Sequence, residues 1–491
     1  MKSLDSIILK QFRIFKDRKE EKPDEEFEWT TATPKLVKKQ KAKWFVWRLD
    51  NNVVDEDWSH LDRFKIRSNN DQIIFRSSKT DGMYRSKGKL DMIIEITPLV
   101  CKDYSIARFK AYVDKREGLK ISHIMKKLNS NEQSRPEVVD LTKQEPIKLE
   151  VNQIVSLIGA PGTGKSTKMA DIVAKLHNKR KIVYFSPTHA QVCNFAAKLK
   201  ALGVKFAILS DESRVDEEFL NEHRCNIERV KEKYKNTIPV DTQVTLCTIN
   251  KPIKFVYKAN VEVVLIDEAS KITILEAFTA LYQIDSLKLL IVGGDDRQIG
   301  CEGPRFSKLE NILEHADRRA DVRFEVLTTY RLNSYATYVT SECFYDGKLN
   351  PSKVGSGGVY GIVIESQHVC NKTMACQREA EIAVRVATMM GRKTTLVVTP
   401  YKSQIAEIEA IDDEVRVETV DTVQGREEKN VIFSMGRPER RGFVKKNRIN
   451  VATSRQTDNL VVLLHSKILQ DIPELKKLFS IIEKDDRVFV V

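Results

Sequence analysis

A glycine-rich segment at residues 159–167 carries the strongest chemical signal in the chain. It lies between an apolar run at 154–158 and a helix-compatible run at 168–176, which is the arrangement of a phosphate-binding loop with the pattern GxxxxGK[ST]. Glycines let the backbone curl so that its N–H groups point at an anion, beside the positive end of a helix. A chance glycine-rich turn would lack these flanking runs, so we predict a nucleoside triphosphate site. Its residues are Gly159, Ala160, Pro161, Gly162, Thr163, Gly164, Lys165, Ser166 and Thr167.

Four polar side chains have the types that phosphoryl transfer requires. Lys165 is placed to reach the β- and γ-phosphates, and the Ser166 hydroxyl to hold Mg²⁺. About a hundred residues later, the apolar run 263–266 ends in Asp267 and Glu268. Asp267 could bind Mg²⁺ through water, and Glu268 could polarise the water that attacks the γ-phosphate. An acidic first turn of a helix is the alternative explanation of this acidic pair.

Further polar residues follow later apolar runs. Gln298 comes after the strand-like run 289–292, where a neutral amide can accept from a water and donate to a phosphate oxygen. Tyr330 and Arg331 combine a ring for stacking with a guanidinium for a phosphate. The strand-like run 181–185 also ends in polar residues, at the edge where a parallel sheet binds its ligands.

The elements that must position these residues are predicted to form a parallel α/β sheet. From residue 151 onward, apolar strand runs alternate with helical patterns, which is typical of this fold class. Residues 119–150 begin with a helical pattern at 121–128 and become polar, so we expect a linker or stalk there. A charged segment at 211–235 is expected to be a solvated helical hairpin.

Residues 1–118 are predicted to be a β-rich accessory domain. Short aromatic and β-branched runs at 43–48, 72–76 and 92–96 are separated by turn residues, as in a small sheet or barrel. All four tryptophans lie in this part, and they fit either the core of that domain or a surface that stacks bases. An amphipathic helix is expected at 4–15; an acidic run follows it, so we favour a packing helix over a transit peptide.

Composition constrains the partners. The 491 residues, 41% of them hydrophobic, are enough for about three to four domains. A net charge of +13 suits a polyanionic partner without identifying one. The eight cysteines form no CxxC pair, so we expect no zinc, no disulfide framework and a cytoplasmic or nuclear setting. No apolar run reaches the length that spans a bilayer, so no membrane partner is expected.

These blocks, in this order, resemble superfamily 1 helicases. The best match is the group that contains the nonsense-mediated-decay helicase and senataxin, with viral relatives among the nidoviruses. Residues 344–349 (FYDGKL), 397–404 (VVTPYKSQ), 419–427 (TVDTVQGRE) and 448–455 (RINVATSR) resemble four blocks of the second half of that family. The resemblance implies two tandem RecA-like P-loop NTPase domains, at about 151–335 and 336–491.

The resemblance also implies a role for each matching residue. Gln298 and Arg331 would contact the γ-phosphate, Tyr330 would stack on the base, Glu427 would bind the ribose or couple the domains, and Arg455 would be the arginine finger. The nucleotide would be ATP with Mg²⁺. A track for single-stranded nucleic acid would be lined by Pro187, Thr188, Thr248, Thr399, Pro400 and Thr422.

The resemblance favours RNA over DNA and movement from 5′ to 3′. An NTPase that remodels or packages ribonucleoprotein without processive unwinding is the main alternative. A nucleoside or polynucleotide kinase would lack the blocks at 419–427 and 448–455, and a catalytically dead scaffold would not need Lys165, Asp267 and Glu268.

Three features depart from the family pattern. Thr457 stands where a second arginine is expected, and no convincing glutamine motif precedes the loop, which weakens the case for adenine. The cysteine- and histidine-rich N-terminal module of the decay and nidovirus helicases is missing. Residues 35–118 instead occupy the position of the small β-barrel insertion of the family.

Overall fold

The computed structural model describes seven strands within residues 30–98 by their backbone, and most of the later chain with its side chains. The later described parts are residues 122–130, 132–141, 149–209, 242–249, 260–281, 284–301, 310–355, 357–365, 375–437 and 444–491. The helix expected at 4–15 and the charged hairpin expected at 211–235 lie outside the described residues. Residues 9–118 form one compact unit, and the residues from 122 onward belong to another.

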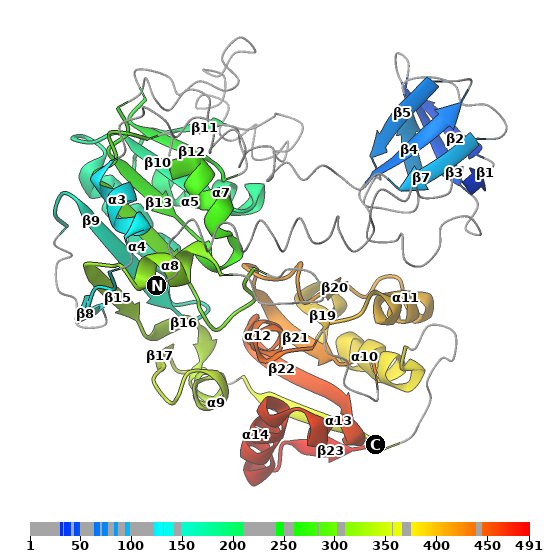
Figure 1. Cartoon of the computed structure of the whole chain (residues 1–491). Coiled ribbons are helices and arrows are strands. Elements are labelled where there is room, and N and C mark those ends of the chain that lie inside the picture. The colour runs from blue at the N-terminus through cyan, green and yellow to red at the C-terminus, as the bar shows by residue number, and fades with distance from the viewer. Residues whose placement is uncertain are drawn as a thin grey trace. The chain divides into compact units, whose positions relative to one another are not determined.

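The N-terminal unit contains two antiparallel sheets (Figure 1, blue). One has the order β1-β7-β4-β5, and the other the order β2-β3-β6. The bounds are β1 Thr30–Ala32, β2 Pro34–Gln40, β3 Trp44–Leu49, β4 Arg63–Ser68, β5 Asp71–Arg76, β6 Met83–Ser86 and β7 Ile94–Pro98. Strands β3, β5 and β7 overlap the three runs expected from the sequence. Whether the tryptophans form the core of this unit or a surface that stacks bases depends on their side chains, which lie outside the described part of the structure.

The first α/β sheet has eight strands in the order β11-β12-β10-β13-β14-β9-β15-β8. Its recorded pairings are all parallel. The strands are β8 Glu137–Asp140, β9 Gln153–Gly159, β10 Ile182–Ser186, β11 Ala207–Leu209, β12 Val244–Thr248, β13 Val263–Ile266, β14 Leu289–Gly294 and β15 Val322–Val326. The helices are α3 His123–Asn129, α4 Lys165–Leu176, α5 His189–Ala201, α7 Ile274–Leu281 and α8 Ile312–Asp317, with the short helix η6 at Ala269–Lys271. Every residue of β10, β12, β13 and β14 is buried, which explains why these runs are apolar without alternation.

The segment 119–150, expected as a linker, contributes two elements to this first domain. Strand β8 pairs in parallel with β15 at the edge of the sheet. Helix α3 begins after Ser122, whose hydroxyl accepts from the N–H of Met125. The carbonyl of Leu128, at the other end of α3, lies 3.0 Å from Nε2 of the buried His315 in α8. The segment is therefore packed against the first domain over residues 122–130 and 137–140.

The second α/β sheet has six parallel strands in the order β20-β19-β21-β22-β18-β23. They are β18 Val359–Ile364, β19 Thr395–Thr399, β20 Val417–Thr419, β21 Glu428–Ser434, β22 Gln456–His465 and β23 Val488–Val490. The helices are α9 Ser334–Phe344, α10 Gln377–Met390, α11 Lys402–Ile411, α12 Lys446–Ala452, α13 Ser466–Asp471 and α14 Pro473–Ile482, with the short helices η8 Arg392–Thr394 and η9 Glu483–Asp485. A separate two-stranded sheet joins β16 Thr328–Asn333 to β17 Asn350–Lys353.

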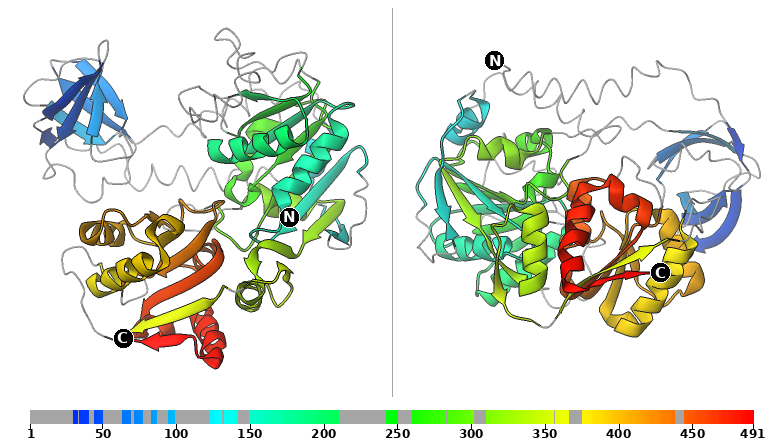
Figure 2. Two further views of the ribbon diagram at one scale, coloured as in Figure 1. Left: turned by 180° about the vertical axis from the view of Figure 1, so that it is seen from behind. Right: turned by 90° about the horizontal axis from the view of Figure 1, so that it is seen from below.

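Both faces of the second sheet are covered by helices, as the two views in Figure 2 show. Successive residues of β21 point to opposite faces: Ile432 joins a core with α10 and α11, and Phe433 joins a core with α9, α12 and α14. Both side chains are fully buried, and each such burial contributes about 1.5–3 kcal/mol. The expected fold class, α/β with two parallel RecA-like sheets and a β-rich N-terminal part, is confirmed.

Within the described residues, no helix is long and apolar enough to cross a membrane. The same residues contain no group of three or more His, Cys, Asp and Glu side chains arranged to hold a metal ion.

Candidate functional site

The glycine-rich loop connects the carboxyl end of β9 to the first residue of α4. Gly162 and Gly164 have φ angles of 69° and 81°, in the left-handed region that glycine adopts without steric cost. A Cβ at Gly162 would lie 2.3 Å from Cβ of Arg331, so the loop also needs glycine for its close approach to β16. Helix α4 has no side-chain cap, and its first N–H groups therefore remain available to an anion.

Lys165 lies inside the curve of this loop. Its ammonium donates to the carbonyl oxygens of Gly159, at 2.7 Å, and of Ala160, at 3.0 Å. The side chain is buried, and Asp295 is among the charges around it. A buried cation inside such a loop can bind phosphate oxygens, which is the role that the sequence predicts for Lys165.

Asp267 and Ser166, the two predicted Mg²⁺ ligands, contact each other beside the loop. Oγ of Ser166 donates to Oδ2 of Asp267 at 2.6 Å, and the N–H of Glu268 donates to Oδ1 at 2.9 Å. Burial raises the pKa of Asp267, the neighbouring Glu268 raises it further, and the bond from Ser166 opposes both. A hydroxyl and a carboxylate are oxygen ligands of the kind that Mg²⁺ prefers, so this pair fits the ion.

Tyr184 supports Asp267 and was not predicted as a site residue. Its hydroxyl donates to Oδ2 of Asp267 at 3.1 Å, and its ring stacks on Phe195 at a centroid distance of 3.8 Å. Burial and Asp267 raise the pKa of Tyr184 well above its ordinary value, so the hydroxyl keeps its proton. A tyrosine inside an apolar strand run is the signal that could have indicated a polar partner.

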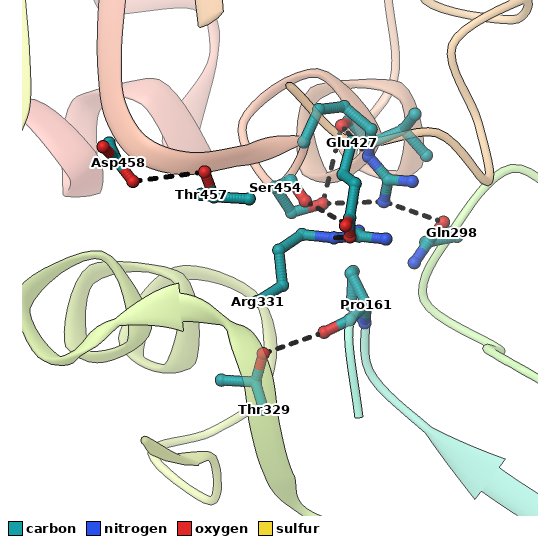
Figure 3. A network of polar contacts seen from close by, with 10 residues as sticks. Pro161, Gln298, Thr329, Arg331, Glu427, Ser454, Thr457 and Asp458 are labelled. Carbon is teal, nitrogen blue, oxygen red and sulfur yellow. Dashed lines mark hydrogen bonds and ion pairs between the residues drawn. The ribbon is translucent and has the colours of Figure 1, made fainter. Parts of the chain in front are cut away.

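Strand β16 forms a wall beside the loop. Oγ1 of Thr329 donates to the carbonyl of Pro161 at 3.1 Å, a contact drawn in Figure 3, and the N–H of Tyr330 donates to the carbonyl of Gly162 at 2.8 Å. Tyr330 is 61% exposed, and a Cβ at Gly164 would lie 3.9 Å from its ring. An exposed ring next to a phosphate-binding loop is available for stacking on a base.

Arg331 reaches from the same strand to the second domain. Its Nε donates to Oε2 of Glu427 at 2.9 Å, and its Nη1 donates to the carbonyl of Ser454 at 3.2 Å (Figure 3). The arginine side chain is 10% exposed, whereas Glu427 is 60% exposed. Two residues predicted to bind different parts of the nucleotide thus contact each other across the domain boundary.

Arg455 completes this arrangement from the second domain. Its Nη2 donates to Oε1 of Gln298 at 3.3 Å and to Oγ of Ser454 at 3.0 Å, and its Nε donates to the carbonyl of Val451 at 3.0 Å. Burial lowers the pKa of the guanidinium to about 9, with a further contribution from Arg331, so Arg455 remains charged at pH 7. The buried side chain thus contacts Gln298 of the first domain as well as two residues of its own domain.

Thr457, which stands in place of the expected second arginine, lies apart from these contacts. Its hydroxyl donates to Oδ1 of Asp458 at 3.2 Å (Figure 3). The carbonyl of Asp458 in turn accepts from Nδ2 of Asn333 at 2.9 Å. Position 457 therefore supplies a neutral hydroxyl where a second cation was expected, and its neighbour Asp458 connects β22 to β16.

The residues expected along the nucleic-acid track occupy strand ends and loops of both domains. Thr188 is exposed and caps α5, accepting from the N–H of Gln191 at 3.3 Å. Thr422 is also exposed, and its hydroxyl donates to the carbonyl of Thr419 at 2.8 Å. The loop of Thr422 approaches α5, since a Cβ at Gly425 would lie 3.5 Å from Nε2 of Gln191.

The other four expected track residues are less accessible. Pro187 is half-buried, and Thr248, at the end of β12, is 7% exposed. Thr399, at the end of β19, is fully buried, and its hydroxyl accepts from the N–H of Tyr401 at 3.4 Å. Pro400 is buried as well. The structure therefore brings exposed hydroxyls to the predicted track only at Thr188 and Thr422.

The chain is similar to several known proteins. Two family models, both described as AAA domain, match residues 144–304 and 361–467. The chain is 26% identical over 444 residues to the ATP-dependent helicase NAM7 of Saccharomyces cerevisiae, a match that covers 74% of this chain and 42% of that protein. It is 24% identical over 436 residues to the human DNA replication ATP-dependent helicase/nuclease DNA2, covering 73% of this chain and 39% of that protein. It thus spans less than half the length of both relatives.

Among solved structures, the Arterivirus nonstructural protein 10 (helicase) matches over 92% of this chain and 79% of its own, at 14% identity and a TM-score of 0.46.

Proposed function

We propose that this chain, which belongs to the superfamily 1 helicases of the group that contains the nonsense-mediated-decay helicase and senataxin, is an ATPase that moves along single-stranded nucleic acid and unwinds duplexes. The contact between Arg455 of the second domain and Gln298 of the first carries the proposal. A kinase with a single RecA-like domain would have no such contact. A composite site of this kind supports hydrolysis that depends on the approach of two domains.

The chemistry would be divided between the two domains. Lys165 and the loop amides would bind the phosphates, Ser166 and Asp267 would hold Mg²⁺, and Glu268 would orient and polarise the attacking water. Mg²⁺, when bound, neutralises charge on the phosphate oxygens. Arg331 and Arg455 would stabilise the charge that develops on the transferred phosphoryl group.

Arg331 and Glu427 would couple the nucleotide to domain closure. Their side chains lie 2.9 Å apart as an ion pair between the domains. A triphosphate offers Arg331 a stronger anionic partner, and a ribose offers hydroxyls to Glu427. Exchange of partners on binding, and its reversal after hydrolysis, would alternate two interdomain arrangements. With each domain holding the strand in turn, this alternation would move the protein along it.

The finer assignments come from the resemblance. We propose RNA as the favoured strand and 5′-to-3′ as the direction of movement. The net charge of +13 is compatible with either nucleic acid. The named relatives include one described as a DNA replication helicase/nuclease, so DNA is the competing substrate.

Matched oligonucleotides test the proposal. ATP hydrolysis is measured with RNA and DNA of one sequence, and strand displacement is measured on duplexes with 5′ or 3′ tails, with Lys165→Ala as the inactive control. We expect stronger stimulation by RNA and displacement of 5′-tailed duplexes only. Stimulation without displacement on either tail would favour the ribonucleoprotein-remodelling alternative. Absence of stimulation by both nucleic acids would overturn the proposal.

A further inference from the structure

A buried series of hydrogen bonds links the end of β14 to helix α12 through the hydroxyl of Tyr345. This hydroxyl donates to Oδ2 of Asp295 at 2.7 Å and accepts from Nδ2 of Asn450 at 2.8 Å. Oδ2 of Asp295 also accepts from Nε2 of Gln298 at 2.8 Å. Oε1 of Gln298 in turn accepts from Nη2 of Arg455 at 3.3 Å. The series therefore leaves the second domain at Tyr345 and returns to it at Arg455.

The chemistry of the groups sets the direction of each bond. The Asp295 carboxylate can only accept, so Tyr345 and Gln298 must both donate to it. Tyr345 has a single proton to give, so it accepts from the amide of Asn450. The Gln298 amide has its nitrogen facing Asp295, and its oxygen is therefore left for Arg455. Burial, with Asp295 beside it, raises the pKa of Tyr345 well above its ordinary value, so this donor is retained at all ordinary pH values.

The links of this series are shielded from water. Asp295 is 3% exposed, Gln298 5%, Tyr345 7% and Asn450 not at all. A buried polar group that loses its partner cannot easily replace it with water, and it then favours a different geometry. Removal of one hydroxyl should therefore disturb the next members of the series.

Contacts other than those of its hydroxyl also hold Tyr345 in place. Arg297 holds the residues on both sides of it, since Nη1 donates to the carbonyl of Phe344 at 2.6 Å and Nη2 to Oδ2 of Asp346 at 2.7 Å. The guanidinium also lies 5.6 Å from the centroid of the Tyr345 ring. A phenylalanine at position 345 should thus occupy the same place and lack only the two hydrogen bonds.

We propose that Tyr345 is a positioning residue whose hydroxyl, through Asp295, holds Gln298 and Arg455 in the arrangement that hydrolysis requires. This role rests on the proposed function. The hydroxyl contacts Asp295 and Asn450, neither of which belongs to the phosphate-binding loop. Its loss should therefore affect the rate of hydrolysis more than the binding of the nucleotide, because the interaction matters most in the transition state.

The test is Tyr345→Phe in the full chain, with kcat and KM for ATP measured at saturating nucleic acid. We expect kcat to fall about 10- to 100-fold, as for loss of a hydrogen bond to a charged group, and KM to change less than about threefold. Tyr335→Phe is the matched control: Tyr335 lies on α9 and its hydroxyl also donates to a carboxylate, Asp485, at 2.6 Å, but at the surface. The control should retain wild-type kcat.

A double-mutant cycle separates positioning from a general loss of structure. In the Gln298→Ala background, Tyr345→Phe should lower kcat less than about twofold, because the group that it positions is already gone. Asn450→Ala interrupts the series at its other end and should lower kcat in the same direction, which keeps the test available if Tyr345→Phe is unstable.

The outcomes distinguish the two proposals. In an active wild-type enzyme, an unchanged kcat in both Tyr345→Phe and Asn450→Ala, or full additivity with Gln298→Ala, would overturn the positioning role and leave the proposed function intact. A wild-type chain without ATP hydrolysis would overturn the proposed function, and this role with it.

Discussion

The two α/β domains share a parallel-sheet architecture and differ in what they place at their strand ends and in their cores. The first carries the phosphate-binding loop and the acidic pair, with Lys165 and Asp267 close to its sheet. The second contributes Glu427, Arg455 and the carbonyl of Ser454 to the contacts around that site. The first domain therefore supplies the loop and the predicted Mg²⁺ ligands, and the second supplies groups that contact first-domain residues across the domain boundary.

Their buried ionisable groups also differ. The first domain buries His315, a base, between α8 and α3. The second buries Glu379, an acid, whose Oε1 accepts from Oγ of Ser434 at 2.8 Å and from the N–H of Gly436 at 2.7 Å. Burial favours the neutral form of both, so it lowers the pKa of His315 to about 4 and raises that of Glu379 to about 7. The contributions of His315 and Glu379 to stability should therefore respond to pH in opposite directions.

The largest expected effect comes from removing the second domain's arginine from the site. Arg455→Ala should lower nucleic-acid-stimulated ATP turnover by about 10³- to 10⁵-fold, as for other arginine fingers, while ATP binding is retained. Turnover and the binding of a fluorescent ATP analogue are the measurements. Arg392→Ala, which removes a guanidinium that pairs with Asp412 and Glu414 in the same domain, is the control. Normal turnover in Arg455→Ala would contradict the assignment of Arg455 as the arginine finger.

Glu379 should make the second domain less stable as pH rises. Its folded pKa is above the ordinary value of 4.5, so the folded state binds the extra proton, and stability is lost between about pH 4.5 and 7. The change is roughly 3 kcal/mol at most. Glu379→Gln should abolish this slope. Hydrogen exchange of α10 amides at pH 5 to 8 measures it; an equal slope in both proteins would contradict the prediction.

His315 should make the first domain less stable as pH falls. Its folded pKa lies below the ordinary 6.5, so the unfolded state takes up the proton first, and stability is lost between about pH 6.5 and 4. Loss of up to roughly 3 kcal/mol is expected, and His315→Gln should remove the dependence. Hydrogen exchange of the α8 amides over this pH range measures the loss of stability. The α10 amides serve as an internal comparison, because Glu379 should stabilise their domain as pH falls.

The smallest expected effect concerns the segment 122–140 that joins the first domain. Ser122→Ala removes the cap of α3 and should lower the free energy of unfolding of the first domain by about 1 kcal/mol. Ser122→Asp should restore it, because aspartate is also a good cap. Denaturant titration followed by exchange of α3 and α8 amides measures the effect. If only α3 exchanged faster, this segment would be an independent stalk after all.

The sequence predicted features that depend on local pattern and missed those that depend on distant contacts. The loop with Lys165, and the acidic pair at Asp267, follow from runs of neighbouring residues, because a strand, a turn and a helix are encoded within about 20 positions. The membership of the family and the fold class, expected from the same blocks, are confirmed. Strand β8 was missed because a four-residue edge strand beside a polar run has almost no periodic signal.

Partners that meet only in the folded chain could not be predicted. Tyr345 and Asp295 are 50 residues apart, and Arg331 and Glu427 are 96 apart. Nothing in either local pattern encodes the other partner, since packing of the two domains sets both distances. Nothing in the sequence around Glu379 marks it as buried, and its burial follows from the packing of α10 against the second sheet.

The contact between Gly162 and β16 has a consequence for mutational tolerance. With a φ of 69° and the Arg331 Cβ only 2.3 Å from its own Cβ position, residue 162 excludes every side chain for two independent reasons. Gly203 has a similar φ of 71° but no atom within 4 Å of its Cβ position, so it is limited by backbone conformation alone. A side chain at position 162 would therefore disturb the loop and β16 together, and a smaller residue at position 331 would not relieve the clash, because every residue except glycine has a Cβ.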